Sequence, residues 1–156
     1  MDKSQLLTLL LGQMQQELNA AQVAAREAHE GAIHEQSKAE TQYDTIGLEH
    51  AYLAEGQSRR IAELHGEIIS LRNLPPAVQG DGQIRFNSLI VLEDDNATQM
   101  RLWLLPAGGA QSVQSPAGPV QVITPKSPIA GLLRGKLAGD SIRLANGREM
   151  HILSID

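Results

Sequence analysis

Apolar and small residues recur near the start of the chain at steps that alternate between four and three. They are Leu7, Leu11, Met14, Leu18, Ala21, Ala25, Ala28 and Ala32. This spacing is a heptad seam, the stripe through which one helix packs against another. From Ser4 to Arg72 there is no proline, and strong helix formers such as Ala, Leu, Gln and Glu predominate. The pattern therefore predicts a long amphipathic helix.

A second apolar seam follows further along the same helical segment. It runs through Ile61, Leu64, Ile68 and Leu71. Large side chains stand near both outer ends of the segment and small ones in the middle, as an antiparallel pair of helices requires. If Leu7 faces Leu71 and Leu18 faces Ile61, the paired positions add up to 78 or 79. The chain is then expected to reverse near residue 39.

A capping pattern supports the same place for the reversal. Ser37-Lys38-Ala39-Glu40 fits a capping box, which marks the start of a helix. We therefore predict an antiparallel coiled-coil hairpin over residues 1–74, with its tip near 36–41. One alternative stays open, because no proline or glycine forces a turn near residue 39. In that alternative the segment is a single unbroken helix that dimerises as a coiled coil.

The second half of the chain reads as a small β-rich domain. Leu74-Pro75-Pro76 ends the helical segment, and residues 75–83 form a linker. The expected strands are Ile84–Leu92, Met100–Leu105, Val120–Thr124, Ser141–Ala145 and Glu149–Ile155. Asn146-Gly147 predicts a tight hairpin between the last two. Ser127–Arg134 predicts a short helix, with Ser127 as its cap and Pro128 in its first turn. The predicted fold class is α+β, with a head over residues 84–156.

Composition narrows the functional classes. The chain has no cysteine, which excludes disulfides and thiolate metal sites. No segment approaches the roughly 20 apolar residues that cross a bilayer, and the start lacks the features of a signal peptide, so we expect a cytoplasmic protein. Residues 1–75 carry 6 Lys/Arg and 11 Asp/Glu, whereas residues 76–156 carry 7 of each. The acidic hairpin argues against direct, nonspecific or sequence-specific binding to DNA.

Carboxylates gather around the predicted tip. Glu35, Glu40 and Asp44 are of the type that holds Mg²⁺, which takes one or two protein carboxylates and otherwise keeps water or phosphate oxygens. From spacing alone a solvated helix end is the simpler interpretation, since acids suit the first turn of a helix. His29, His34 and His50 follow no ligand spacing, so we expect polar surface positions there. No nucleophile–base pairing is found that would predict a self-contained hydrolase.

One segment resembles a known family. Ser127-Pro128-Ile129-Ala130, then Leu132-Leu133, Gly135-Lys136 and Gly139-Asp140, closely resembles the C-terminal signature of the bacterial Gre (GreA/GreB) transcript cleavage and elongation factors. The match extends to residue type, spacing and place in the chain. Upstream, Ile84–Ser88 resembles the start of the same domain in that family. The preceding helical hairpin and the total length are also similar to the family's.

The resemblance implies an FKBP-like head that docks on RNA polymerase at the rim of its secondary channel. Ser127, Pro128 and Ile129 are the docking contacts that it implies. The hairpin would enter the channel and bring its acidic tip to the polymerase active centre. The polymerase then cuts backtracked nascent RNA near its 3′ end.

The resemblance also implies the chemistry of the tip. Glu40 would help to hold the polymerase's Mg²⁺ and a water, with Glu35 or Asp44 as the second acid. The ion activates the water and stabilises charge in such reactions. The protein would then be no enzyme itself, and it would need no cofactor beyond the Mg²⁺ of the polymerase active site.

The tip departs from the family's pattern, in which an Asp is followed three residues later by Glu-Asn and a nearby Tyr. Glu40-Thr41-Gln42-Tyr43 supplies the Glu and the Tyr, but Thr41 replaces Asn and Ser37 replaces Asp. Lys126 also stands where the family often has Asp or Asn. A non-cleaving regulator in the same channel is therefore an alternative. A dimeric coiled-coil adaptor is another, and a prolyl isomerase is disfavoured by the few aromatic residues.

Overall fold

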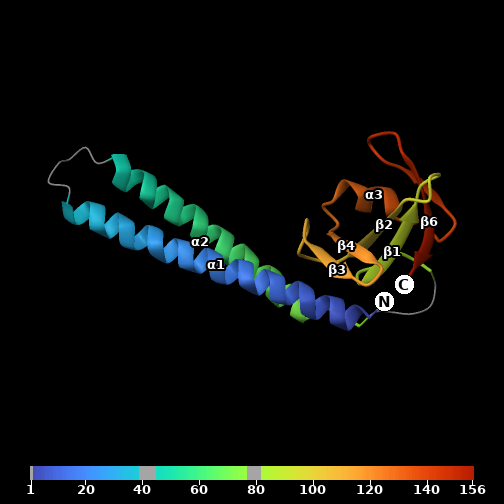
Figure 1. The fold of residues 1–156 in the computed structure, drawn as a ribbon, viewed down its shortest axis with the longest axis horizontal. Coiled ribbons are helices and arrows are strands. Elements are labelled where there is room, and N and C mark those ends of the chain that lie inside the picture. The colour runs from blue at the N-terminus through green and yellow to red at the C-terminus, as the bar shows by residue number, and fades with distance from the viewer. Residues whose placement is uncertain (1, 39–44, 77–81) are drawn as a thin grey trace. The chain divides into compact units, whose positions relative to one another are not determined.

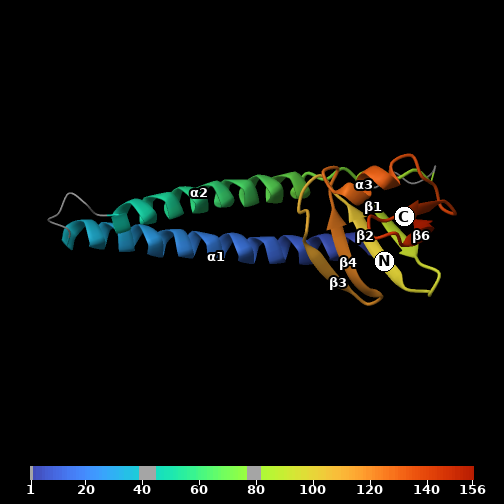
Figure 2. The same ribbon diagram turned by 90° about the horizontal axis from the view of Figure 1, so that it is seen from above.

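The structure, a computed structural model, describes residues 2–38, 45–76 and 82–156. The helical half forms two helices, α1 (Lys3–Lys38) and α2 (Thr45–Arg72). Within the compact unit Gly12–Ile68 they lie side by side and run antiparallel (Figures 1 and 2). The predicted helical hairpin is thereby confirmed, and the alternative of one unbroken helix is wrong. A second compact unit comprises Met1–Leu11 and Ile69–Asp156.

The capping pattern at Ser37 does not start the second helix. The first helix continues to Lys38, and α2 begins at Thr45. Residues from Ala32 to Lys38 include no proline or glycine, so nothing in them stops the first helix. Residues 39–44, which include Glu40 and Asp44, lie outside the described residues.

The hairpin seam agrees with the sequence in most of its positions. Met14 and Leu18 on α1 and Leu64 and Ile68 on α2 are all buried, none more than 3% exposed. Nearer the start of α1 the buried residues are Leu6 and Leu10, whereas the predicted Leu7 and Leu11 are half-buried. All four of these positions are leucine, so the pattern offers two adjacent rows and cannot choose between them.

A small charge cluster connects the two helices. Arg60 of α2 donates from Nη2 to Oε1 of Glu17 on α1 at 2.6 Å. Its other terminal nitrogen lies 3.8 Å from Glu63 and 3.9 Å from Glu67. The hydrogen bond to Glu17 raises the pKa of Arg60 above its ordinary value. The residue numbers of Arg60 and Glu17 add up to 77, one less than the lower of the two sums predicted for facing positions. The pair therefore supports the register derived from the seam.

We expect Arg60→Ala to destabilise the hairpin by less than about 1 kcal/mol, because both partners remain nearly half exposed to screening solvent. Arg60→Glu should cost more, since it places a fourth carboxylate beside Glu17, Glu63 and Glu67. Thermal unfolding followed by circular dichroism measures both effects, and about 1 M salt should narrow the gap between the two variants. Arg59→Ala is the control, because Arg59 pairs along its own helix with Glu55 and, among the described residues, forms no ion pair with α1. An Arg59 variant as unstable as Arg60→Glu would contradict this role for Arg60.

The head is a six-stranded sheet with one short helix. Its elements are β1 (Ser88–Glu93), β2 (Gln99–Leu104), β3 (Ser112–Ser115), β4 (Gly118–Ile123), α3 (Pro128–Leu133), β5 (Ser141–Arg143) and β6 (Glu149–Ile155). The strand order is β3-β4-β2-β1-β6-β5. Neighbouring strands pair antiparallel except for β2 and β4, which are parallel. The α+β fold class predicted from the sequence is confirmed.

The core of the head forms where these strands meet α3. Buried side chains from the central strands and from the helix make up one cluster: Ile90, Leu92, Leu102, Ile123, Leu133, Ile142, Met150 and Ile152.

Two predictions about strands need correction. The first strand begins at Ser88 and not at Ile84, because residues before it form a turn. The strand β3 was not predicted, because its four residues, SVQS, show too little alternation of apolar and polar positions.

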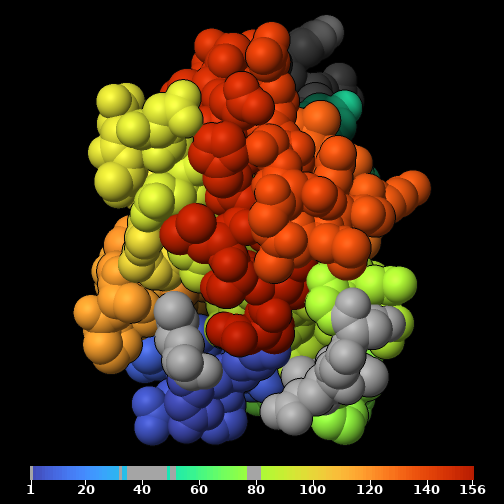
Figure 3. All heavy atoms as spheres, turned by 90° about the vertical axis from the view of Figure 1, so that its right-hand side faces the viewer, coloured from blue at the N-terminus to red at the C-terminus, as the bar shows by residue number. Residues whose placement is uncertain are grey.

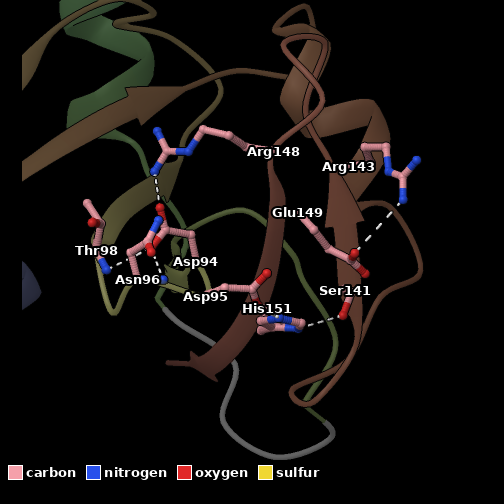
Figure 4. A network of polar contacts seen from close by, with 9 residues as sticks. All are labelled: Asp94, Asp95, Asn96, Thr98, Ser141, Arg143, Arg148, Glu149 and His151. Carbon is pink, nitrogen blue, oxygen red and sulfur yellow. Dashed lines mark hydrogen bonds and ion pairs between the residues drawn. The ribbon is translucent and has the colours of Figure 1, made fainter.

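The turn between β1 and β2 is held by one carboxylate. Oδ1 of Asp94 accepts hydrogen bonds from the backbone N–H of Asn96 at 3.0 Å and of Thr98 at 2.8 Å. Its Oδ2 accepts from the guanidinium of Arg148, which begins the approach to β6 (Figure 4). These hydrogen bonds lower the pKa of Asp94, and the bond from the backbone of Thr98 has the largest effect. The acidic run that starts at Glu93 therefore forms a turn, and it also joins two segments that are distant in the sequence.

Asp94→Asn should lower the stability of the head at neutral pH and flatten its response to acid. The pKa of Asp94 is lower in the folded protein than the ordinary 3.8. Its contribution is therefore complete above that value and is lost as the pH falls through the folded pKa. Urea denaturation between about pH 7 and pH 3 should show the wild type converging on the variant at the acid end. Asp156→Asn, at an exposed aspartate of the same domain, is the control, and an equal effect from it would contradict this assignment.

Candidate functional site

The residues implied as docking contacts open the helix α3. Ser127 stands at the N-cap position, but its hydroxyl makes no capping bond. The hydroxyl instead accepts from the backbone N–H of Thr124 at 3.0 Å, while the Ser127 N–H donates to the Thr124 carbonyl at 2.8 Å. These two bonds close the turn that leads from β4 into the helix. Pro128 follows at the first helical position, where its fixed φ and missing N–H cost nothing.

The short helix α3 is anchored by one side and open on the other. Leu133 is 1% exposed and packs in the core of the head. Gly135, at φ +72°, ends the helix in a conformation that favours glycine. Leu132 remains 41% exposed, and Ile129 is half-buried. Leu133 anchors α3 to the core while Leu132 stays accessible, so α3 offers an apolar surface that is held in place.

The three predicted contacts line a single hollow. Ser127, Pro128 and Ile129 contribute to a depression of about 410 Å³ whose walls also include Leu132 of α3 and Leu144 after β5. Most of the side chains on these walls are apolar, so the hollow suits a protruding apolar group from a partner. We call it the α3 hollow. The structure thus brings the three contacts together on one accessible surface.

Charge on the head is segregated along the chain. Residues 96–139 contain Arg101, Lys126, Arg134 and Lys136 but no Asp or Glu. Among the described residues these four cations form no ion pair. The arginines beyond this segment differ, because Arg143 lies 3.9 Å from Glu149 and Arg148 pairs with Asp94. The equal numbers of charges in the second half of the chain therefore conceal a cationic segment that contains α3.

Figure 3 views the face of the head that carries this segment. The C-terminal strands, in red, separate the β1–β2 turn, in yellow, from the orange segment around α3. The acid-rich turn and the part of the cationic segment around α3 therefore lie on opposite sides of this face. Unpaired cations beside an apolar hollow favour a partner with acidic groups around an apolar anchor.

The structure describes little of the three predicted tip acids, Glu35, Glu40 and Asp44. Glu35 belongs to α1, and nothing further is described of its side chain. Glu40 and Asp44 lie outside the described residues, so their role as Mg²⁺ ligands stays a prediction. Among the residues that the structure does describe, no group of three or more His, Asp or Glu side chains is placed to hold a metal ion. His29 is exposed, in keeping with the polar surface position expected for it.

A serine, a histidine and an aspartate do meet on the head. The Ser141 hydroxyl lies 2.8 Å from Nδ1 of His151, and Nε2 of His151 lies 3.1 Å from Oδ1 of Asp95 (Figure 4). Ser141 and His151 are directly opposite each other on β5 and β6. The register of the sheet alone therefore brings them together, as cross-strand pairs do. We assign this group to the stability of the sheet edge.

Two features were not predicted from the sequence: the cationic segment 96–139, which contains no acid, and the turn before β1 that hydrogen bonds hold in place. The acid-free run of 96–139 was visible in the sequence, but counting charges over whole halves concealed it. The turn at Phe86 and Asn87 was assigned to a strand, because Ile84-Arg85-Phe86 alternates like one. In the described part of the chain, no helix combines the length and the hydropathy needed to cross a membrane.

No family model matches the chain, and no curated protein matches its sequence. Among solved structures, it is similar to the GreA factor homolog 1 (Gfh1) protein of Thermus thermophilus at 21% identity, with a TM-score of 0.37 and 94% of each chain covered. Another structure of the transcription factor Gfh1 matches at 21% identity and a TM-score of 0.39, covering 94% of this chain and 93% of that one. Thermus aquaticus Gfh1 matches at 21% identity and a TM-score of 0.36, with 92% of each chain covered. Likeness at this level leaves the function to be argued from the residues of this chain.

Proposed function

We propose that this protein is a Gre-like transcription factor that binds RNA polymerase. The head docks at the rim of the secondary channel through Ser127, Pro128 and Ile129. The helical hairpin enters the channel, where Glu40, assisted by Glu35 or Asp44, helps to hold the catalytic Mg²⁺ of the polymerase. The polymerase then cleaves backtracked RNA, and this protein supplies a part of that site and no active site of its own.

One observation carries the proposal. The segment that resembles the Gre signature, Ser127 to Asp140, includes the rigid helix α3 and the residues at the mouth of the α3 hollow. A docking role requires residues that are accessible and fixed, and these are both. The antiparallel hairpin supports the second half of the proposal, because a narrow pair of helices suits a channel that admits no larger domain.

Two measurements test the proposal. Purified protein is first titrated into core RNA polymerase, and then added to a backtracked elongation complex with Mg²⁺. We expect saturable binding and release of a short 3′ RNA fragment. Ile129→Asp should weaken binding at least about tenfold, because it puts a charge where an apolar contact is required. Leu153→Asp is the matched control, on an exposed apolar residue of β6.

A second function is favoured by the sequence of the tip. In this second function, the protein occupies the channel without promoting cleavage, because Thr41 and Ser37 replace the Asn and Asp of the family. Binding to polymerase with altered initiation or pausing, but with no cleavage, would establish that regulator. If the protein neither binds polymerase nor changes transcription, both functions are wrong. Light scattering that shows a stable dimer would then favour the coiled-coil adaptor.

A further inference from the structure

The head presents an aromatic side chain that its own fold does not cover. Phe86 is the one phenylalanine of the chain and is 47% exposed. It lies in the turn before β1, whereas the one tryptophan, Trp103, is fully buried nearby in β2. Leaving so much aromatic surface in water is unfavourable. The exposure therefore calls for a physical cause.

The turn around Phe86 is held in place by hydrogen bonds on both sides. Asn87 adopts φ +71°, a conformation that costs energy for any residue other than glycine. Its N–H donates to the Leu104 carbonyl at 2.8 Å, and its Oδ1 accepts from the buried Nε1 of Trp103 at 3.0 Å. On the other side, the Ser88 hydroxyl accepts from the N–H of Arg85 at 3.0 Å. The fold thus fixes Phe86 in an exposed position and prevents it from collapsing onto the core.

The exposed ring lines a second hollow, distinct from the α3 hollow. On the head, its walls include Ile84, Phe86, Leu104, Pro125, Ala130 and Arg134. We call it the Phe86 hollow. Ala130 belongs to α3 and Arg134 follows directly after it, so one short helix contributes to both hollows.

The charge beside the Phe86 hollow is positive. Arg134 is exposed and forms no ion pair with any described residue. Lys126, next to the lining residue Pro125, is also exposed and unpaired within the described part of the chain. Both belong to the acid-free segment 96–139. A cation that has no acid of its own beside an apolar wall is complementary to an acidic group on a partner.

We propose that the Phe86 hollow is a second anchor point, which receives a bulky apolar side chain from an acidic segment of RNA polymerase. Phe86 packs against that side chain, and Arg134 pairs with a carboxylate next to it. The proposal rests on the proposed function in one respect, since polymerase is the protein that carries the segment. Phenylalanine and arginine are both enriched at protein interfaces, and arginine is among the residues that contribute most to the binding energy. The two hollows together would hold the head in a single orientation, which a single apolar contact would not.

Binding of labelled full-length variants to core polymerase tests this anchor. Phe86→Ser and Arg134→Glu should each raise the Kd about tenfold or more, a change of about 1.4 kcal/mol. The affinity of Arg134→Glu should also fall less steeply with salt than that of the wild type. The controls are Leu153→Ser, at an equally exposed apolar residue, and Arg143→Glu, the same charge reversal at an arginine of β5. Both controls should stay within about twofold of the wild type.

The outcomes separate this proposal from the function on which it rests. If the wild type binds, Ile129→Asp weakens binding and both Phe86→Ser and Arg134→Glu bind normally, the second anchor is wrong and the proposed function stands. If the wild type does not bind polymerase, both are wrong. If Arg134→Glu loses affinity for a single-stranded RNA oligonucleotide but not for polymerase, the surface binds RNA and the proposal is overturned. Circular dichroism of each variant checks that the fold is retained.

Discussion

Replacing Glu40 with alanine is expected to slow the cleavage of backtracked RNA by about 100-fold and to leave binding to polymerase unchanged. A carboxylate that positions a water or a catalytic ion contributes about 10²–10⁴-fold to the rate of such reactions. The docking residues begin at Ser127, far along the chain from residue 40. Affinity and cleavage should therefore respond to different substitutions. Single-turnover cleavage at saturating protein measures the rate without interference from binding.

Three further variants locate the acid more closely. Glu35→Ala and Asp44→Ala should differ from each other, because only one of them is expected to supply the second carboxylate. Glu30→Ala is the matched control. Glu30 is an exposed acid on α1, the helix that also carries Glu35, and it is further along the chain from residue 40. Cleavage by Glu40→Ala at the wild-type rate would show that the tip assignment is wrong. Cleavage that is equally slow in Glu30→Ala would point to net charge of the hairpin as the cause.

The hairpin could be predicted because its pattern is long and repetitive. Its register was derived from Leu7 with Leu71 and from Leu18 with Ile61. Leu18 and Leu71 are buried, whereas Leu7 and Ile61 are half-buried. The pattern failed where it was degenerate, at the leucines of positions 6, 7, 10 and 11. There a shift of one residue leaves an equally apolar row, so the sequence alone cannot choose between the two.

The head was predictable as a class but not in its details. Strands with clear alternation, such as Glu149–Ile155, were placed within a residue of their bounds. The parallel pairing of β2 with β4 had no local signal, because pairing across a crossover depends on contacts distant in sequence. The same holds for Asp94 and Arg148, which are 54 positions apart and meet through the sheet.

The candidate site shows a similar division. Ser127, Pro128 and Ile129 were chosen from a sequence motif, and the structure adds that they line one hollow with Leu132. Nothing in the motif indicated that Phe86 is exposed. The sequence pattern placed Phe86 inside an expected strand, Ile84–Leu92. The bond between Trp103 and Asn87, formed by tertiary contact, is what turns the chain there.

Trp103→Ala is therefore expected to destabilise the head more than any surface substitution, by about 3–5 kcal/mol. Its side chain is 0% exposed, on the central strand β2 between Leu89 of β1 and Val122 of β4. Truncation leaves a cavity and also removes the donor to Asn87. Urea denaturation followed by far-ultraviolet circular dichroism measures the loss, since the fluorescence of the one tryptophan disappears with it.

Trp103→Phe separates the two contributions. It keeps most of the apolar contact but lacks the indole N–H, so the nearly buried Oδ1 of Asn87 loses its partner at a cost of about 1–3 kcal/mol. Because that bond holds Asn87 at positive φ, the same variant should loosen the turn that exposes Phe86 and weaken binding to polymerase. Leu153→Ala, at an exposed residue of the same sheet, should change stability by less than about 0.5 kcal/mol. Wild-type stability in Trp103→Phe would mean that Asn87 is held by its backbone bond to Leu104 alone, and that Phe86 is exposed for another reason.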